Sequence, residues 1–115
     1  MAEFLRHADE RLIGSGRVSL KQRQGLFWGM FHGDLYVTDQ RVCFHMKMTG
    51  STVMELLLQE IQGFMVGYSF FLTAVRIYSR EGKEYKITGM LAKEVGEWLL
   101  EAGVLRLEEA PRAGS

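Results

Sequence analysis

Residues 33–44 read Gly-Asp-Leu-Tyr-Val-Thr-Asp-Gln-Arg-Val-Cys-Phe, two runs of alternating apolar and polar residues around a polar dipeptide. Successive side chains of a β-strand point to opposite faces, so this alternation predicts two strands that each bury one face. Asp39 and Gln40 suit the turn between them, because aspartate side chains bond to nearby turn backbone. We therefore expect a β-hairpin with strands at 33–38 and 41–48.

The second strand of this hairpin separates its side chains by polarity. The apolar set is Val42, Phe44, Met46 and Met48, and the opposite set is Arg41, Cys43, His45 and Lys47. We expect the apolar set to face a hydrophobic core, together with Leu35 and Val37 of the first strand.

Five further segments show the same two-residue alternation, with glycines between them. They lie at about 16–23, 53–58, 62–68, 73–79 and 84–88. Glu81 and Gly82 provide a turn between the last two segments. From seven such short strands we expect a closed or nearly closed sheet.

The apolar period changes after Gly89, where apolar residues recur with helical spacing. The apolar positions are Leu91, Val95, Trp98, Leu99 and Ala102. They line one face of an amphipathic helix, and Gly103 is placed to end it. We expect this face to pack on the barrel, with Trp98 as the plug of one open end.

The chain has 115 residues, which suits one domain rather than two. We expect an N-terminal lead at 1–10, one domain at 11–104 and a flexible tail at 105–115, where the only proline, Pro111, lies. Fourteen basic residues balance fourteen acidic ones, which argues against nucleic acid as a partner. One cysteine, no secretory signal and no apolar run of about 20 residues favour a cytoplasmic protein, free or peripheral to a membrane.

The hairpin at 33–44 resembles the central hairpin of the GRAM domain, whose pattern is G-x-L-Y-[LIV]-[ST]-x-x-x-[LIV]-C-F. Three further segments follow in the order of that family: a strand at 56–61, a hairpin at 74–85 and a final helix with an inward Trp98. The resemblance therefore covers roughly 12–103. It implies a mainly β fold with one α-helix, a pleckstrin-homology-like, seven-stranded, partly open barrel. Two near-orthogonal antiparallel sheets would be capped by the C-terminal helix. GRAM domains often bind phosphoinositides, other anionic lipids or protein partners, which implies a non-catalytic binding module.

The strongest candidate binding residues lie near the first strand turn. Lys21 and Arg23 precede the apolar stretch 26–31, which contains Trp28 and either inserts into an anionic membrane surface or simply extends the second strand. Arg41 and Lys47 complete the basic end that we expect to contact a lipid head group or a protein partner. A second basic patch, with Glu81 and Glu84 as neutralising neighbours, lies around the last hairpin: Arg76, Arg80, Lys83 and Lys86.

Catalytic and metal-binding patterns are weak in this sequence. Cys43 and His45 share a strand face, but no orienting third group is apparent, and the scattered histidines lack zinc-ligand spacing. We therefore expect neither an enzyme nor a metal or cofactor site.

The alternative function is a structural, self-associating domain that forms a homo-oligomer. Adjacent Phe70 and Phe71 cannot both face a core from an extended chain, so either a bulge at 67–69 buries both or one contacts a second copy. Lipid docking should weaken with salt, whereas apolar self-association should not.

Overall fold

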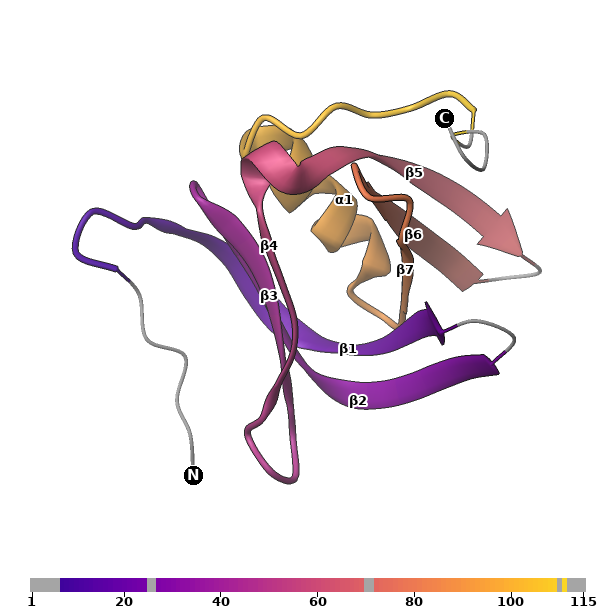
Figure 1. The fold of residues 1–115 in the computed structure, drawn as a ribbon, viewed down its shortest axis with the longest axis horizontal. Coiled ribbons are helices and arrows are strands. Elements are labelled where there is room, and N and C mark those ends of the chain that lie inside the picture. Colours follow the sequence, from indigo (N-terminus) through magenta and orange to yellow (C-terminus); the bar gives the residue numbers. More distant parts are fainter. Residues whose placement is uncertain (1–6, 25–26, 70–71, 110, 112–115) are drawn as a thin grey trace.

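The computed structural model describes residues 7–24, 27–69, 72–109 and 111, without the side chains of 23, 24, 27, 28, 69 and 72. Its elements, in chain order, are β1 (Leu12–Gln24), β2 (Phe27–Thr38), β3 (Arg41–Met46), β4 (Thr52–Leu57), the short 3₁₀ turn η1 (Leu58–Glu60), β5 (Ile61–Ser69), β6 (Leu72–Ser79), β7 (Glu84–Thr88) and α1 (Ala92–Glu101). The described strands form one antiparallel sheet in the order β4-β3-β2-β1-β7-β6-β5. Figure 1 shows β3 and β4 crossing the direction of β5 and β6, with α1 between the two groups of strands.

The hairpin predicted at 33–44 is present, with Leu35 opposite Phe44 and Val37 opposite Val42. All four of these side chains are fully buried, as the alternation predicted. The turn at Asp39 is tied to the start of β1, because the Arg11 N–H donates to the Asp39 carboxylate at 3.0 Å. The hairpin therefore forms one wall of the core and also fixes where β1 begins.

Strand β1 joins the two groups of strands. It pairs with β2 along nearly its whole length but with β7 only through four residues, 19–22. Leu20 of β1 and Ile87 of β7 face each other across this seam and are both fully buried. Burial of these apolar side chains is the main favourable term that closes the sheet around its core.

Helix α1 buries the apolar face that the sequence predicted and ends at Glu101, just before Gly103, whose φ is +91°. Trp98 packs against the core and lies over Gly14 of β1. A Cβ at Gly14 would fall 2.2 Å from the indole ring, so glycine there leaves the space that Trp98 occupies. The helix therefore packs closely on β1 because this position has no side chain.

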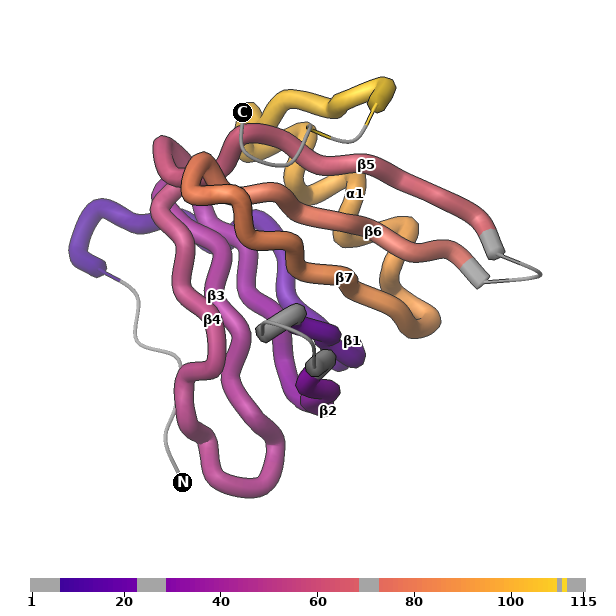
Figure 2. The backbone as a smooth tube through the Cα atoms, turned by 45° about the vertical axis from the view of Figure 1, so that its right-hand side comes forward, coloured from indigo at the N-terminus to yellow at the C-terminus, as the bar shows by residue number. Residues whose placement is uncertain are grey.

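The two edge strands of the sheet, β4 and β5, are protected from pairing with other chains in different ways. Strand β4 carries an irregularity opposite the Phe44–His45 step, a feature that discourages pairing with another chain. Strand β5 is covered at Phe64 by residues 105–107, where Arg106 forms a parallel bridge. Figure 2 shows this C-terminal segment, in yellow, running beside β5. The packing of the domain thus continues past residue 104.

Three sequence predictions need correction or lie outside the described residues. Met48 is 86% exposed and Met46 only half-buried, because β3 ends at Met46 and the chain then turns through Gly50. The bulge expected at 67–69 is wrong, since β5 continues there in regular register with β6. Phe70 and Phe71 are outside the described residues.

We predict that Gly14→Ala destabilises the protein by about 1–3 kcal/mol, because the added methyl group collides with Trp98 in a packed interface. Urea unfolding followed by far-UV circular dichroism measures the change. Gly67→Ala is the matched control, since no atom lies within 4 Å of its added Cβ. Equal destabilisation of the two variants would contradict the packing of Trp98 described above.

Candidate functional site

Five residues lie directly opposite one another on five neighbouring strands. In order across the sheet they are Met30 (β2), Lys21 (β1), Lys86 (β7), Arg76 (β6) and Met65 (β5). We call this set the basic row. Residues opposite one another on adjacent strands share a face of the sheet, so the three cations are neighbours at a strand spacing of about 4.8 Å.

The basic row lies on the outer face of the sheet. Leu20, Ile87 and Ile77, which flank the row along their strands, are fully buried and point to the core. Alternation then places Lys21, Lys86 and Arg76 on the opposite, solvent side. An open hollow of about 400 Å³ lies here, lined by Met30, the three cations and Glu84.

A second hollow of about 150 Å³ adjoins the first and shares Arg76 and Lys86 with it. Its remaining lining comes mostly from β5, including Gly67 and Tyr68. Glycine inside a strand weakens it, and an added Cβ at Gly67 would meet nothing within 4 Å. Packing among the described residues therefore does not account for glycine at this position, which borders the second hollow.

The three cations of the basic row lack ion-pair partners among the described residues, where salt bridges within 4 Å involve other side chains. Like charges directly opposite each other on neighbouring strands are destabilising, by roughly 0.2–1 kcal/mol for each pair. Lys86 has such a neighbour on both sides, and Glu84 is the acidic residue that lines the hollow. The free protein thus carries local repulsion that a bound anion would relieve.

The structure brings few of the sequence-predicted site residues together. Lys21 belongs to the basic row, whereas Lys47 is exposed beyond the end of β3, and Arg41 lies at the start of that strand. The backbone of β1 and β2 pairs Arg23 with Trp28, which confirms that the apolar stretch extends β2 from Phe27 on, while Leu26 lies outside the described residues. The side chains of Arg23 and Trp28 are outside the described residues, so their binding role stays a prediction.

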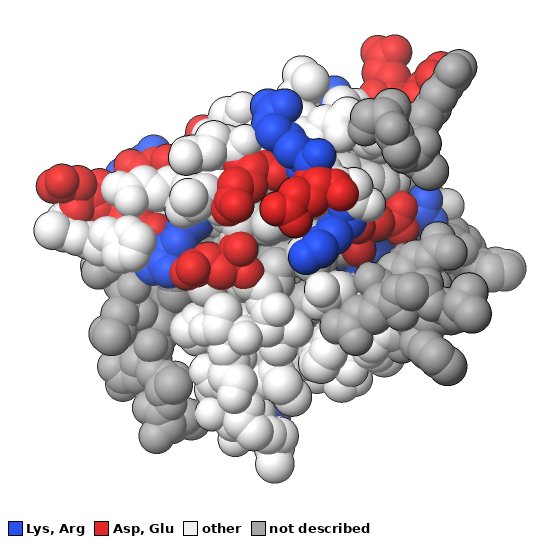
Figure 3. All heavy atoms as spheres, in the orientation of Figure 1, with Lys and Arg blue, Asp and Glu red and all other residues white. Residues whose placement is uncertain are grey.

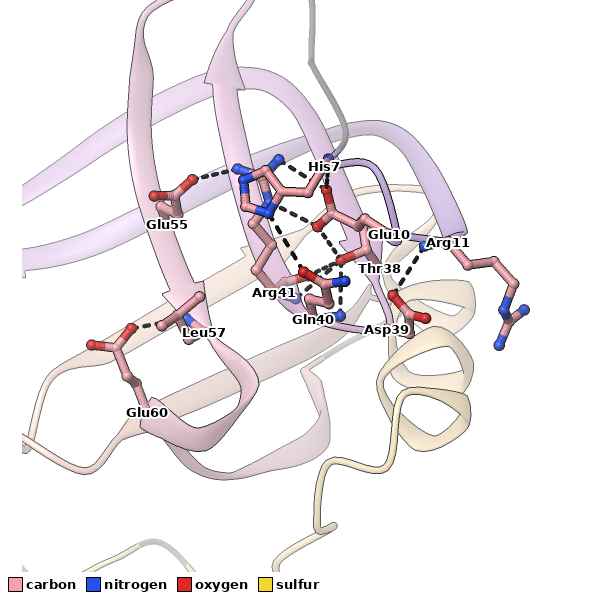
Figure 4. Close-up of polar contacts among 10 residues, drawn as sticks. All are labelled: His7, Glu10, Arg11, Thr38, Asp39, Gln40, Arg41, Glu55, Leu57 and Glu60. Atoms are coloured by element: carbon pink, nitrogen blue, oxygen red, sulfur yellow. Dashed lines mark hydrogen bonds and ion pairs between the residues drawn. The ribbon is translucent and has the colours of Figure 1, made fainter.

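Arg41 is buried in an ion-pair cluster rather than displayed on the surface (Figure 4). Its guanidinium donates to both oxygens of Glu10, at 2.8 and 3.0 Å, and also contacts Glu55. The Thr38 hydroxyl donates to Glu10 at 2.6 Å. These bonds hold the pKa of Glu10 at about 2, chiefly through the guanidinium hydrogen bonds, and raise the pKa of Arg41. The cluster therefore fastens the N-terminal lead to the β2–β3 hairpin.

Cys43 and His45 share the face of β3 opposite to Val42 and Phe44, where Cys43 is buried, and are poorly suited to nucleophilic chemistry. Burial raises the pKa of the Cys43 thiol to about 11 and lowers the pKa of His45. A thiolate is then scarcely populated near neutral pH, and the thiolate is the nucleophilic form. Among the described residues, no cluster of three His, Cys, Asp or Glu side chains is arranged to hold a metal ion.

The sequence alone predicts the three cations of the basic row in two separate patches, with Lys21 near the first turn and Arg76 and Lys86 around the last hairpin. It does not mark Met30 or Met65 as site residues. The pairing of β1 with β7 unites the two patches, and no local sequence pattern specifies that pairing. The face seen in Figure 3 carries acidic and basic side chains next to one another.

Comparison with known proteins identifies the fold and leaves the family open. No protein-family model and no curated protein matches the chain. Solved structures do: the C-terminal domain of an unknown protein from Leishmania infantum matches with a TM-score of 0.64 and 17% identity, over 83% of this chain and 85% of that one. The PH domain of human pleckstrin homology domain-containing protein family A member 5 matches with a TM-score of 0.57 and 13% identity, over 99% and 93% of the two chains.

A further match is an N-terminally truncated linker-DH/PH fragment of p115-RhoGEF, with a TM-score of 0.56 and 16% identity. That match covers 93% of this chain and 32% of the fragment. These likenesses confirm the predicted pleckstrin-homology-like fold. The finer resemblance to GRAM domains stays a prediction. In the described part of the chain, no helix is long and apolar enough to cross a membrane.

We predict that Glu10→Ala destabilises the protein by about 3 kcal/mol, since it removes the buried carboxylate that pairs with the buried guanidinium of Arg41. In the wild type, the lowered pKa of Glu10 contributes stability that is complete above about pH 4.5 and is lost as the pH falls towards 2. Urea unfolding between pH 7 and pH 2 should therefore show the gap between wild type and variant closing over that range. A gap that is independent of pH would contradict this assignment.

Proposed function

We propose that this protein is a non-catalytic binding module that docks on an anionic membrane surface through the basic row. The observation that carries the proposal is the row itself, in which Lys21, Lys86 and Arg76 stand side by side without ion-pair partners among the described residues. Arrangements that destabilise a sheet, such as like charges on neighbouring strands, occur most often at functional sites. A phosphate group would turn the repulsion within the row into favourable charge-assisted contacts.

The surroundings of the row favour a lipid surface over an acidic protein. Met30, at one end of the row, is 54% exposed, and Tyr68, which lines the second hollow, is 77% exposed. Tyrosine is enriched at membrane interfaces, where its ring contacts the apolar region and its hydroxyl stays hydrated. The resemblance of the 33–44 hairpin to GRAM domains, whose members often bind anionic lipids, points in the same direction.

The expected affinity for membranes is modest. A Lys or Arg near an anionic surface contributes about 1 kcal/mol, so three cations supply about 3 kcal/mol. The contribution falls with salt, because the Debye length shrinks from about 8 Å at physiological ionic strength to about 3 Å at 1 M. Docking would therefore be reversible and would respond to the anionic lipid content of the surface.

The first test is sedimentation with vesicles of phosphatidylcholine alone or mixed with phosphatidylserine, at low and moderate salt. We expect pelleting only with the anionic vesicles, weaker at the higher salt. Lys86→Ala should reduce binding about fivefold, the equivalent of about 1 kcal/mol, and Arg76→Ala combined with it about 25-fold. Neither change should destabilise the fold, since each removes like-charge repulsion.

Lys83→Ala is the matched control, because Lys83 is an exposed cation of the β6–β7 turn that lines a different hollow. It should bind as the wild type does. An equal loss in this control would mean that total charge, not the row, governs binding. Absence of wild-type pelleting under every condition would reject membrane docking, and salt-insensitive pelleting would favour apolar self-association.

Glu84→Gln is expected to have the opposite effect. Glu84 is the acidic residue in the lining of the larger hollow, where its charge opposes an incoming anion. Neutralising it should strengthen binding to the anionic vesicles roughly two- to fivefold at low salt, by the same charge argument. Unchanged or weaker binding by this variant would show that the anion does not enter that hollow.

A further inference from the structure

The outer edge of β5 pairs with an extended segment of the same chain, residues 105–107. The Phe64 N–H donates to the Leu105 carbonyl at 2.9 Å, and the Leu107 N–H donates to the Phe64 carbonyl at 2.8 Å. Gly63 provides the room for this contact, because an added Cβ would fall 2.6 Å from the Leu107 side chain. The protein's own C-terminal segment therefore lies on β5 as a short parallel strand.

This pairing stops while β5 continues. Backbone groups of alternate residues point to the same edge of a strand, so those of Val66 and Tyr68 point where those of Phe64 do. The C-terminal segment bends at Glu108 and Glu109, and among the described residues its backbone bonds to this edge end at Leu107. In the part of the chain that the structure describes, two further positions of this edge, Val66 and Tyr68, have no neighbouring segment bonded to them.

A hollow of about 160 Å³ lies beside these positions, between β5 and α1. Val66 and Tyr68 line it from the strand, and Gly96 and Leu100 line it from the helix. Tyr68 and Leu100 are 77% and 51% exposed, so apolar surface surrounds the hollow. The site combines hydrogen-bonding backbone with a place for one apolar side chain.

Gly96 of α1 lies in the lining of the hollow, and the absence of a side chain there supports a binding role for it. Glycine is among the least favourable residues inside a helix, and here it is not required by packing. An added Cβ would lie 3.4 Å from Val66, 3.8 Å from Phe64 and 3.9 Å from Val75, which are ordinary contact distances. Alanine would fit and would stabilise the helix, yet it would make the hollow shallower.

The charges at the rim indicate the chemistry of an occupant. Lys93 and Arg106 line the hollow with one acidic residue, Glu97, so the rim has a net positive charge. An apolar side chain in the hollow with an acidic residue next to it would complement this rim. The C-terminal segment has this order itself, with Leu107 followed by Glu108 and Glu109.

We propose that the groove between β5 and α1 binds an extended segment of a partner protein, which continues the strand pairing at Val66 and Tyr68. One apolar side chain of the segment occupies the hollow over Gly96, and an acidic neighbour contacts Lys93 and Arg106. This surface uses neither Lys21 nor Lys86, although it shares Val66 and Tyr68 with the lining of the second hollow beside the basic row.

The test is selection of random twelve-residue peptides displayed on phage, run in parallel on the wild-type protein and on Gly96→Leu. We expect peptides enriched on the wild type alone, with an apolar residue followed by Asp or Glu. A synthetic copy of an enriched peptide should shift the amide resonances of Val66, Tyr68 and Gly96 in a ¹⁵N spectrum. Its affinity should fall at least tenfold for Gly96→Leu.

Two variants separate loss of binding from loss of fold. Gly96→Ala should raise the melting temperature by about 4 °C while weakening the same peptide, because it stabilises the helix and partly fills the hollow. The charge-reversed pair Lys93→Glu and Arg106→Glu should reverse the preference for acidic peptides. The proposal would be overturned if no peptide were enriched on the wild type, or if the enriched peptides bound Gly96→Leu equally well. A concentration-dependent dimer of the wild type that Gly96→Leu abolishes would also overturn it, and would identify a second copy of the protein as the occupant.

Discussion

The structure depends on four residue pairs between β1 and β7, which among the described residues join the first four strands to the last three in the hydrogen-bonded sheet. Leu20 and Ile87 form the buried side of this seam, while Lys21 and Lys86 form its outer side. Closing the core therefore forces two cations together, with Arg76 as the next neighbour. The apolar gain from burial exceeds the cost of this repulsion, so the fold maintains a basic surface that the sheet itself does not need.

Not every basic residue of this protein is available to a ligand. Arg41, the first residue of β3, is predicted from the sequence to be a surface cation, yet its guanidinium lies between the carboxylates of Glu10 and Glu55. Removing such a charge from water is costly unless it is paired and hydrogen-bonded, which explains why Glu10 accepts from the guanidinium and why the Thr38 hydroxyl in turn donates to Glu10. The same contacts fasten the N-terminal lead, so the role of Arg41 is to hold the fold together.

The fold could be predicted from the sequence more fully than the site. Alternation around Asp39–Gln40 and the helical spacing from Leu91 to Ala102 are local signals, and both correspond to elements of the structure. The basic row depends on which strands become neighbours, which Lys21 and Lys86 do not specify locally. The role of a glycine is likewise not predictable from the local sequence. Gly14 and Gly96 look alike in sequence, but only at Gly14 would a Cβ collide with another side chain.

The most direct test of the central claim, that the basic row is an anion-binding surface, is a ¹⁵N amide spectrum recorded with small anionic bicelles and with neutral ones. The row predicts shifts that appear only with the anionic bicelles and that centre on Lys21, Lys86 and Arg76, with weaker effects at Gly67 and Tyr68. Shifts centred instead on Lys47 and the β3–β4 turn, or equal shifts with neutral bicelles, would contradict it.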